Sequence, residues 1–512
     1  MGPGLRIVDI MNFLNELEER FPVGQWRVDG IHIWPMIRLE LATNLTHYAM
    51  YPALYDSTKS VSNAGRLPRL LFQEASGLIR YVKAFLSDFS RNARPEKAKV
   101  VFLSDGVSFS YLIDSWYEKW CDPFISKLSE ENIPSFLMTP SHQYDIPRRT
   151  PSRFIQPSLD WIRAKTLLSS SRRDEKTRLD RFQEFVEFIG SRRLGVPLPD
   201  MGSIQNQCLL VIKYTEFFER LFSVIKPRFG FLVSYYNIVG MAFNLACRRL
   251  GIVSVDIQHG LQGDLHWAYG RWRNVPEEGY EVLPRFFWVW SDVEAEAIRR
   301  WRSPHSPWHQ PIVGGNLFLD MWRSSSNEMV KYYDEKIGDF KREKRGFTHI
   351  LYTVGYEEAD KLTMIFDAIK QTESFCWWWL RMHPGKLKER DAFKRAIREH
   401  GLTNGGVDLA TDLPLYALLR QMDLHLTFYS SSVFEAEEMG VPSVVVGEFG
   451  QELFSNQISS GWGYPANCVE EIISGIKVQF DKREELKRKK SQGTPKKRID
   501  VMEFIRQAGV VV

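Results

Sequence analysis

The chain has 512 residues, of which 44% are hydrophobic and 25% are charged, and its formal net charge is +4. This is the composition of an ordinary globular protein, and its length suggests roughly two to four domains, each with its own core. The 67 basic and 63 acidic side chains nearly cancel, which excludes wholesale nucleic-acid binding. We therefore expect no nucleic-acid partner.

The five cysteines are scattered along the chain and show no Cys-x-x-Cys spacing. They predict a reducing compartment, with neither a disulfide framework nor a structural zinc site. The N-terminus is amphipathic and lacks the apolar core of a signal peptide. No apolar run approaches the length of about 18 residues that a membrane span needs. These features predict a cytoplasmic protein.

The first part of the chain, residues 1–95, reads as a helical N-terminal extension around an aromatic segment at residues 26–38. Asp29 and Gly30 are a hairpin turn signal within this segment. The indoles of Trp26 and Trp34 are suited to stacking on the sugar ring of an acceptor, and core packing explains them nearly as well.

Two series of apolar runs then alternate with helical stretches. The first series of predicted strands occupies residues 99–104, 133–139, 229–234, 252–257, 285–290 and 311–313, with a helical stretch at 111–128 and a charged helical region at 151–228. The second occupies residues 349–354, 375–382, 423–428 and 442–446, with helices at 358–370, 387–400, 413–421 and 433–439. Such alternation predicts parallel βαβ units, and hence an α/β protein of two Rossmann-like domains with a boundary near residues 314–345.

The motifs described next all follow the carboxyl end of a predicted strand. In open α/β sheets, ligands bind in the crevice at that end. We therefore expect His259, His383 and Ser431 to face one cleft.

The first motif, residues 256–260, lies where a predicted strand runs out into a loop. Gly260 permits a sharp turn, so that His259 would point into the cleft and either donate to a phosphate or transfer a proton. The alternative is a histidine that bonds a neighbouring loop carbonyl. The loop that follows, residues 261–273, is dense in acidic, imidazole, aromatic and guanidinium groups, which is unusual for a connector.

The second motif, residues 381–385, ends a strand that contains three consecutive tryptophans. Pro384 fixes the backbone and keeps His383 out of helical geometry. Lys386 and Lys388 follow at the start of a helix, where free amides favour anions. This arrangement suits a phosphate group, and the alternative is a strand-to-helix turn with an exposed histidine.

The third motif places three serines, at 430–432, between a strand and a helix. Serines at a helix start cap free amides, and the same hydroxyls and amides form a cradle for an anion. Glu435, one turn into the helix, could accept hydrogen bonds from ribose hydroxyls.

In this order, the segments IQHG (257–260), RMHPG (381–385) and SSSVFEAEEMGVPSVVVG (430–447) resemble the capsule and lipopolysaccharide glycosyltransferases. These include β-Kdo transferases, bacterial sialyl- and polysialyltransferases and, more distantly, the CDP-glycerol polymerases of teichoic acids. Gly314, Gly315 and Asn316, with Asp320, also look like the crossover between the halves of many GT-B enzymes. The resemblance covers residues 229–465.

The resemblance implies the two-domain GT-B fold, with an acceptor domain at residues 96–315, a donor domain at 316–481 and a basic tail at 482–512. It implies a nucleotide-sugar donor, with CMP-sugars such as CMP-Kdo or CMP-sialic acid favoured, and a bacterial polysaccharide or glycolipid acceptor. We expect no metal cofactor.

The resemblance also assigns roles to residues. His259 would face the sugar or the acceptor. The donor-binding residues would be Gln258, Gly260, Arg381, His383, Pro384, Ser430, Ser431, Ser432 and Glu435. Retaining Kdo transferases carry an acidic nucleophile upstream of the QHG element, but here residues 234–237 contain no carboxylate. The nucleophile then lies elsewhere, or the enzyme inverts with a general base, for which Asp264 and Asp105 are the candidates; the alternative for each is a turn or cap aspartate.

Two other functions fit the same residues. One is a nucleotide-sugar epimerase or hydrolase, which needs no polymeric acceptor, and the other is a non-catalytic polysaccharide-assembly protein. The basic segment at residues 482–497 also has two interpretations. It is either a solvated helix face and tail, or a patch that draws the protein to the anionic surface of the inner membrane or to a polysaccharide.

Overall fold

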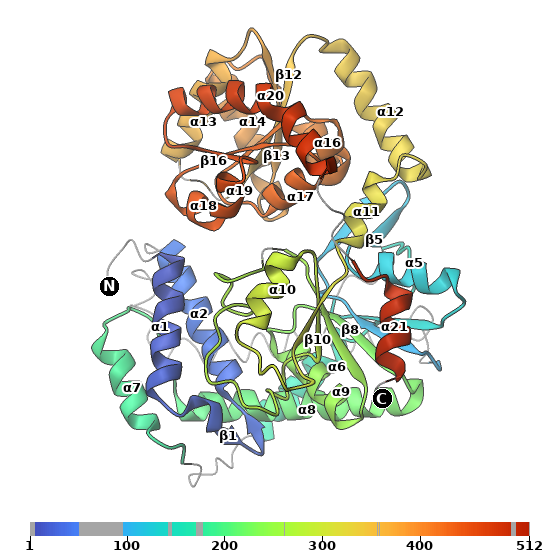
Figure 1. Cartoon of the computed structure of the whole chain (residues 1–512), viewed down its shortest axis with the longest axis vertical. Coiled ribbons are helices and arrows are strands. Elements are labelled where there is room, and N and C mark those ends of the chain that lie inside the picture. The colour runs from blue at the N-terminus through green and yellow to red at the C-terminus, as the bar shows by residue number, and fades with distance from the viewer. Residues whose placement is uncertain are drawn as a thin grey trace. The chain divides into compact units, whose positions relative to one another are not determined.

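The computed structural model describes residues 6–50, 96–141, 146–169, 178–260, 262–355, 357, 359–492 and 498–510. The chain divides into two compact units, each built on a parallel sheet flanked by helices (Figure 1). Unit 1 comprises residues 1–110, 114–317 and 496–512, and unit 2 comprises residues 111–113 and 318–495. The predicted α/β class with two Rossmann-like domains is confirmed.

The sheet of unit 1 runs in the order β11-β10-β9-β8-β3-β6-β7, with every pair parallel. Its strands are β3 (Val100–Leu103), β6 (Ser135–Thr139), β7 (Ser152–Phe154), β8 (Phe229–Val233), β9 (Val253–Ile257), β10 (Phe286–Val289) and β11 (Gln310–Val313). The chain starts at β3, adds β6 and β7 on one side, and then continues from β8 on the other side. The strand order therefore reverses between β3 and β8, and this switch point is where such sheets bind ligands.

Both faces of this sheet are buried, as the continuous apolar runs of its strands predict. Val100 and Phe102 face one core, and Val101 and Leu103 face the other. Apart from those of the N-terminal extension, the described helices of unit 1 are α5 (Asp122–Glu130), α6 (Gln156–Ser169), α7 (Phe182–Ser191), α8 (Met201–Ile225), α9 (Ile238–Arg249), α10 (Asp292–Arg299) and α21 (Val501–Val510). The helix predicted at residues 111–128 is wrong in its first half. Residues 109–112 and 115–118 form strands β4 (Phe109–Leu112) and β5 (Ser115–Glu118), and the positive φ of 58° at Ile113 breaks any helix there.

The described part of the N-terminal extension, residues 6–50, contributes to the core of unit 1, and residues 51–95 lie outside the described residues. It contains α1 (Ile7–Arg20), η1 (Val23–Gln25), β1 (Arg27–Val28), β2 (Ile31–His32) and α2 (Trp34–Met50). The predicted turn is confirmed, because β1 and β2 pair antiparallel across Asp29 and Gly30, which have φ values of 49° and 80°. Trp26 is 2% exposed and Trp34 is fully buried, so both indoles pack in the core and offer no face to a sugar ring.

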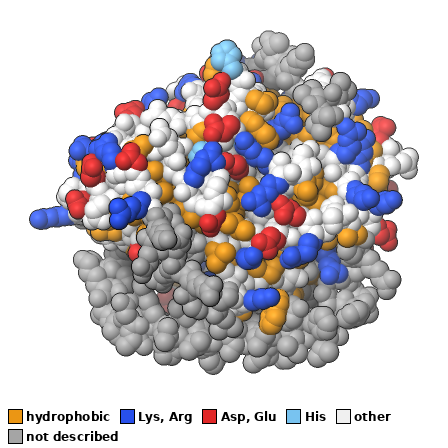
Figure 2. All heavy atoms as spheres, turned by 90° about the horizontal axis from the view of Figure 1, so that it is seen from below, with side chains coloured by type: hydrophobic (Ala, Val, Ile, Leu, Met, Phe, Trp, Pro, Cys, Tyr) orange, Lys and Arg blue, Asp and Glu red, His pale blue; other side chains and the backbone are white. Residues whose placement is uncertain are grey.

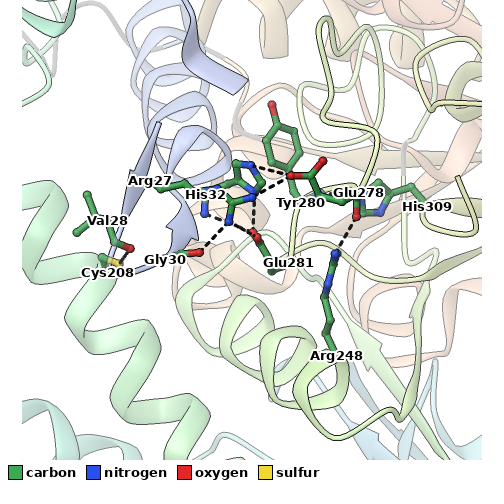
Figure 3. Close-up of polar contacts among 10 residues, drawn as sticks. All are labelled: Arg27, Val28, Gly30, His32, Cys208, Arg248, Glu278, Tyr280, Glu281 and His309. Atoms are coloured by element: carbon green, nitrogen blue, oxygen red, sulfur yellow. Dashed lines mark hydrogen bonds and ion pairs between the residues drawn. The ribbon is translucent and has the colours of Figure 1, made fainter. Parts of the chain in front are cut away.

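Ion pairs fasten this hairpin to the loop at residues 276–283 (Figure 3). Arg27 pairs with Glu278 at 2.9 Å and with Glu281 at 2.8 Å, and Nδ1 of His32 lies 2.8 Å from Glu281. Although burial opposes it, the hydrogen bond with His32 lowers the pKa of Glu281 to about 2. The hairpin is thus held by charge as well as by apolar packing.

The sheet of unit 2 runs in the order β14-β13-β12-β15-β16-β17, again with every pair parallel. Its strands are β12 (Thr348–Val354), β13 (Cys376–Met382), β14 (Gly405–Gly406), β15 (Leu424–Thr427), β16 (Ser443–Val446) and β17 (Gly463–Ala466). The order reverses between β12 and β15, so unit 2 has its own switch point. Its helices are α12 (Glu328–Glu343), α13 (Ala359–Gln371), η3 (Pro384–Glu389), α14 (Arg390–Glu399), α15 (Asp408–Asp412), α16 (Leu415–Gln421), α17 (Ser432–Glu438), α18 (Glu448–Leu453), α19 (Ser455–Ser459) and α20 (Val469–Gln492).

The chain crosses from unit 1 to unit 2 within α11 (Leu317–Arg323), after Leu317, and returns after residue 495. The segment expected to form a basic tail therefore has two structured parts. Residues 482–492 are the last turns of α20, where Arg483 pairs with Asp423 and Lys490 pairs with Glu438. Beyond them, α21 lies beside α5 in unit 1 (Figure 1). Its Phe504 packs on aromatic side chains of β8 and β10.

Surface charge is mixed where it can be seen. On the face drawn in Figure 2, basic and acidic side chains are interspersed among apolar ones. All five cysteines are free thiols. None of the helices within the described ranges has both the length and the hydropathy of a membrane span.

Candidate functional site

The switch point of unit 1 brings together Asp105, Tyr236 and His259. Asp105 follows β3, Tyr236 follows β8 and His259 follows β9, and these three strands are neighbours in the parallel sheet. Their side chains therefore gather at the carboxyl edge of the sheet, where ligands bind in this fold. The sequence predicted His259 and Asp105 here and missed Tyr236.

The hydrogen bonds of His259 fix its tautomer. Its Nδ1 lies 3.1 Å from the carbonyl oxygen of Ile257, which can only accept, so Nδ1 carries the hydrogen. Its Nε2 lies 2.9 Å from the hydroxyl of Tyr236 and therefore accepts from it. Burial lowers the pKa of His259, against a smaller opposing effect of Asp105, so the ring is neutral near pH 7. This histidine is a proton acceptor rather than a donor to an anion.

Aromatic rings enclose this pair. The ring of Tyr236 lies 5.7 Å from that of His259, 5.7 Å from that of His266 and 5.3 Å from that of Trp267, centroid to centroid. Burial, followed by the neighbouring His259, lowers the pKa of His266 to about 3. Burial raises the pKa of Tyr236 to about 12, so the phenol keeps its proton until a base removes it.

The two predicted bases differ in their surroundings. Asp105 accepts hydrogen bonds from the amides of Val107 and Ser108 at 2.9 and 2.8 Å, so it is also a turn aspartate. Asp264 pairs with Arg300 at 2.9 Å and lies 3.8 Å from Arg271. These ion pairs occupy the carboxylate of Asp264 with guanidinium groups.

Gln258 and Gly260 shape the loop rather than line it. Gln258 is 1% exposed, accepts from the amide of Trp290 at 2.7 Å and donates to the carbonyl of Gly260 at 3.0 Å. The φ of Gly260 lies outside the left-handed region, so this glycine is not required by its backbone conformation. Gln258 ties the end of β9 to the end of β10.

A buried carboxyl group under the site was also missed. Asp256, on β9, accepts from the amide of Tyr235 at 2.9 Å and from the hydroxyl of Tyr269 at 2.8 Å. Burial raises the pKa of Asp256 to about 8. The bond from Tyr269 attaches the loop at residues 262–274 to the sheet, and the bond from Tyr235 holds the segment that follows β8.

The N-terminal helices hold the same loop through a buried ion pair. Arg38 and Glu18 are fully buried and lie 2.9 Å apart. Arg38 also donates to the carbonyl of Gly270 at 2.9 Å and to that of Trp267 at 3.3 Å, while Glu18 accepts from the amide of Arg273 at 2.7 Å. The sequence signal was a carboxylate, Glu18, among the apolar positions of an amphipathic helix.

The switch point of unit 2 is lined by loops that follow β12, β13 and β15. They contribute Glu357, His383 and the serines at 430–432. Ser430 and Ser431 are half-buried, and Ser432, the first residue of α17, is 2% exposed. The hydroxyl oxygen of Ser432 lies 3.0 Å from Nε2 of His425, and the hydroxyl of Ser432 donates to the oxygen of Ser430 at 2.8 Å.

The RMHPG motif divides between the surface and the interior. His383 is exposed, and its Nδ1 accepts from the amide of Gly385 at 3.0 Å, while Pro384 begins η3. Arg381 points the other way and donates to the carbonyl of Ala410 at 2.7 Å and to that of Leu413. Burial lowers the pKa of Arg381 to about 10. Arg381 therefore anchors the end of α15, and these contacts occupy its guanidinium group.

Two carboxyl groups are buried in this region. Glu435 is 6% exposed and accepts from the hydroxyl of Tyr416 at 3.4 Å, which places it beneath the loop. Glu357 is 8% exposed and accepts from the amide of Gly355 at 2.7 Å, and burial raises its pKa against the opposing charge of Lys386. The sequence reasoning missed Glu357 because no motif surrounds it. No group of three metal-ligating side chains gathers anywhere in the described ranges.

Comparisons with known proteins gave the following. No family model matches the chain, and no curated protein matches it. Among solved structures, the UDP-GlcNAc 2-epimerase from Methanocaldococcus jannaschii is 14% identical with a TM-score of 0.46. The UDP-GlcNAc 2-epimerase from Neisseria meningitidis, bound to UDP-GlcNAc, is 13% identical with a TM-score of 0.47, and the glycotransferase of kitacinnamycin is 11% identical with a TM-score of 0.42. Each comparison covers 81% of this chain and 99% of the other, and these values assign no family.

Proposed function

We propose that this chain is a glycosyltransferase that moves a sugar from a nucleotide-activated donor to an acceptor hydroxyl. The observation that carries the proposal is the hydrogen bond from Tyr236 to the neutral His259 at the switch point of unit 1. A hydroxyl backed by an imidazole acceptor is the arrangement that general base catalysis needs.

The proton moves in one direction along this pair. As the acceptor hydroxyl attacks the anomeric carbon, its proton passes to the oxygen of Tyr236, and the proton of Tyr236 passes to Nε2 of His259. The hydrogen bond from Nδ1 to the carbonyl of Ile257 then orients the imidazolium ring. The bond between the anomeric carbon and the phosphate oxygen breaks, and the phosphate leaves with the electron pair.

We assign the leaving phosphate to the switch point of unit 2. Ser430, Ser431 and the exposed His383 supply hydroxyl and imidazole donors there, and Lys386 supplies positive charge nearby. Preorganised donors stabilise charge that develops on a leaving group. Arg381 and Glu435 support this site from beneath it, since their side chains are occupied or buried.

The donor and acceptor follow from the resemblance of the ordered motifs to capsule and lipopolysaccharide enzymes. We propose a CMP-sugar, such as CMP-Kdo or CMP-sialic acid, as the donor and a bacterial polysaccharide or glycolipid as the acceptor, without a metal cofactor. Contact with the inner-membrane surface through the basic end of α20 belongs to the same proposal.

A substrate screen tests this function. Thermal shift against CMP, CDP, UDP, GDP and their sugars identifies the nucleotide, since a ligand at a hundredfold excess over its Kd adds about 2.7 kcal/mol of stability. The best donor is then incubated with and without acceptor glycans. Transfer that requires the acceptor supports the proposal, and donor epimerised or hydrolysed equally without acceptor would favour the epimerase or hydrolase. If no nucleotide sugar is bound or consumed, the chain is not an enzyme of this class.

A further inference from the structure

A chain of hydroxyl groups runs from the core of unit 2 to the serine loop, and a buried histidine stands in its middle. His425, on β15, is fully buried. Its Nδ1 lies 3.0 Å from the hydroxyl oxygen of Ser443, on β16, and its Nε2 lies 3.0 Å from that of Ser432. The sequence motifs did not include His425 or draw attention to Ser443.

The direction of this chain follows from counting hydrogens. The oxygen of Ser430 accepts from the hydroxyl of Ser432 at 2.8 Å and from the amide of Ser432 at 3.3 Å. A hydroxyl oxygen has two acceptor positions and one hydrogen. Both acceptor positions of Ser430 are therefore filled, and its hydrogen remains for a further acceptor.

The same count fixes the tautomer of His425. Ser432 has only one hydroxyl hydrogen, which it donates to Ser430, so its oxygen must accept from Nε2–H of His425. Nδ1 is then the acceptor and receives the hydroxyl hydrogen of Ser443. Thr353 lies 3.0 Å from the same Nε2 and 3.3 Å from Ser432. In this direction Ser432 and Thr353 share the single Nε2 hydrogen in a three-centre bond, and Thr353 donates its own hydrogen to Ser432.

We propose that His425 is a positioning residue whose Nε2–H tautomer directs the hydrogen bonds from Ser443 through Ser432, so that Ser430 presents a hydroxyl that only donates. This inference rests on the proposed function, which places a phosphate at the serine loop. It deepens that function because a donor-only hydroxyl selects ligand atoms that only accept, such as phosphate oxygens, over groups that must donate.

Burial keeps this device independent of pH. Burial lowers the pKa of His425 to about 3, so the ring stays neutral throughout the range in which the protein is handled. The direction of the chain therefore does not reverse between pH 5.5 and 8.5.

The tautomer is measured directly on the full-length protein. Long-range ¹H–¹⁵N spectra of ¹⁵N-histidine-labelled protein, with the His425 signals identified by their loss in His425→Gln, are expected to show a protonated Nε2 and a bare Nδ1 at every pH between 5.5 and 8.5. A protonated Nδ1 would reverse the direction of the hydrogen bonds between Ser443 and Ser430 and would overturn the proposal.

Binding of the nucleotide found by the thermal screen, starting with CMP, tests what the relay does. Gln keeps an N–H near the position of Nε2, whereas Asn reaches only the position of Nδ1. We expect His425→Asn to weaken binding about tenfold, the size of one hydrogen bond to a charged group, and His425→Gln to weaken it about threefold or less. In a Ser430→Ala background, His425→Asn should cost nothing further, because it acts through Ser430.

A matched control separates positioning from folding. His349, on β12, is also buried and accepts from the indole of Trp379 at 3.0 Å, and it lies at the opposite end of its strand from the serine loop. His349→Asn should lower the melting temperature and leave nucleotide affinity unchanged. Additive losses from His425→Asn and Ser430→Ala would overturn the positioning role. A wild-type protein that binds no nucleotide would overturn the proposed function and the ligand assigned to Ser430, while the tautomer would still decide the relay.

Discussion

The switch points of units 1 and 2 both lie at the carboxyl edge of a parallel sheet, but their histidines differ in the direction of the hydrogen bond at Nε2. In unit 1, His259 donates from Nδ1 to a backbone carbonyl, so its Nε2 accepts from Tyr236. In unit 2, both ring nitrogens of His425 meet hydroxyl groups, and the count of hydrogens makes Nε2 the donor. Burial lowers the pKa of His259 and of His425, so both rings are neutral.

This difference shows that the partner, and not the residue type, sets what a buried histidine does. A carbonyl partner leaves a basic nitrogen at the edge of unit 1, whereas a chain of hydroxyls sends a hydrogen-bond donor to the edge of unit 2. Under the proposed function, the edge of unit 1 takes the proton of the acceptor hydroxyl, and the edge of unit 2 stabilises charge on the phosphate.

The largest expected effect is at the switch point of unit 1, where Nε2 of His259 accepts a hydrogen bond from Tyr236. Tyr236→Phe keeps the ring that packs on His259, His266 and Trp267 and removes only the hydroxyl. If this hydroxyl passes the proton to His259, turnover should fall about 10²- to 10⁴-fold, the usual contribution of a positioned acid or base. Steady-state transfer measures the change, with nucleotide affinity as the control. Unchanged turnover would show that Tyr236 serves only in packing and would contradict proton transfer to His259.

The pH profile gives the sign of the same effect. His259 must be neutral to accept a proton, and its pKa lies below the ordinary value of 6.5 because the ring is buried. Activity should therefore be lost only as the pH falls through that lowered pKa, and kcat/KM should stay level on this limb above pH 6.5. An acidic limb centred above pH 6.5 would contradict a buried, neutral His259.

The next effect is on stability and is confined to unit 1. Arg38→Met breaks a fully buried ion pair and leaves Glu18 without its cation, which costs about 3–5 kcal/mol in comparable cases. It also frees the loop at residues 266–274, so turnover should fall while nucleotide affinity stays at its wild-type value. The matched control is Arg192→Met, which removes a half-exposed pair with Glu16 on the same helix α1 and should cost less than about 1 kcal/mol. Equal losses in chemical denaturation would show that the buried pair does not hold the loop.

At the switch point of unit 2, His383→Ala should lower kcat about 10²- to 10³-fold, as when one preorganised donor to a developing oxyanion is lost. The effect appears in turnover because the contact strengthens as charge develops on the phosphate. Ser431→Ala should cost less and act on donor affinity instead. Both variants should keep the wild-type melting temperature, because neither change opens an apolar cavity. A near-normal kcat in His383→Ala would remove the phosphate from this edge.

Periodicity was enough to predict the sheets. The strands that carry Asp105, His259, His383 and Ser430 lie within a residue or two of their predicted bounds, because buried parallel strands are short continuous apolar runs. The short strands β7, β14 and β17 were missed because their sequences, SRF, GG and GYPA, contain no continuous apolar run. The β5 strand and the last two residues of β4 were included in the helix predicted at residues 111–128, because their aromatic residues fit either period.

The site was harder to predict because motifs do not show which way a side chain points. Arg381 and His383 are two residues apart, yet one lies on carbonyl groups in the interior and the other is exposed. Tyr236 and His425 were missed for a related reason. Their roles depend on hydrogen bonds to residues 7 to 23 positions away, which the order of the sequence does not display.

The smallest expected effect concerns the basic end of α20. Lys482, Lys487 and Lys489 are exposed there, and the last two form surface ion pairs with Glu484 and Glu485. Lys490 is more buried and lies 3.1 Å from Glu438. If the exposed lysines draw the protein to an anionic membrane, neutralising all three should weaken binding to vesicles that contain anionic lipid, by roughly fivefold for each lysine. Turnover on a soluble acceptor should be unchanged, and added salt should mimic the substitutions, because exposed charges are screened beyond about 8–10 Å at physiological ionic strength.

Lys490→Gln is the matched control. Lys490 helps to lower the pKa of Glu438 from 4.5 to about 2 against the opposing effect of burial, so its loss should reduce stability above pH 4.5 and affect vesicle binding less. Vesicle binding that salt does not weaken, or that survives the triple substitution, would leave this segment as a solvated helix end.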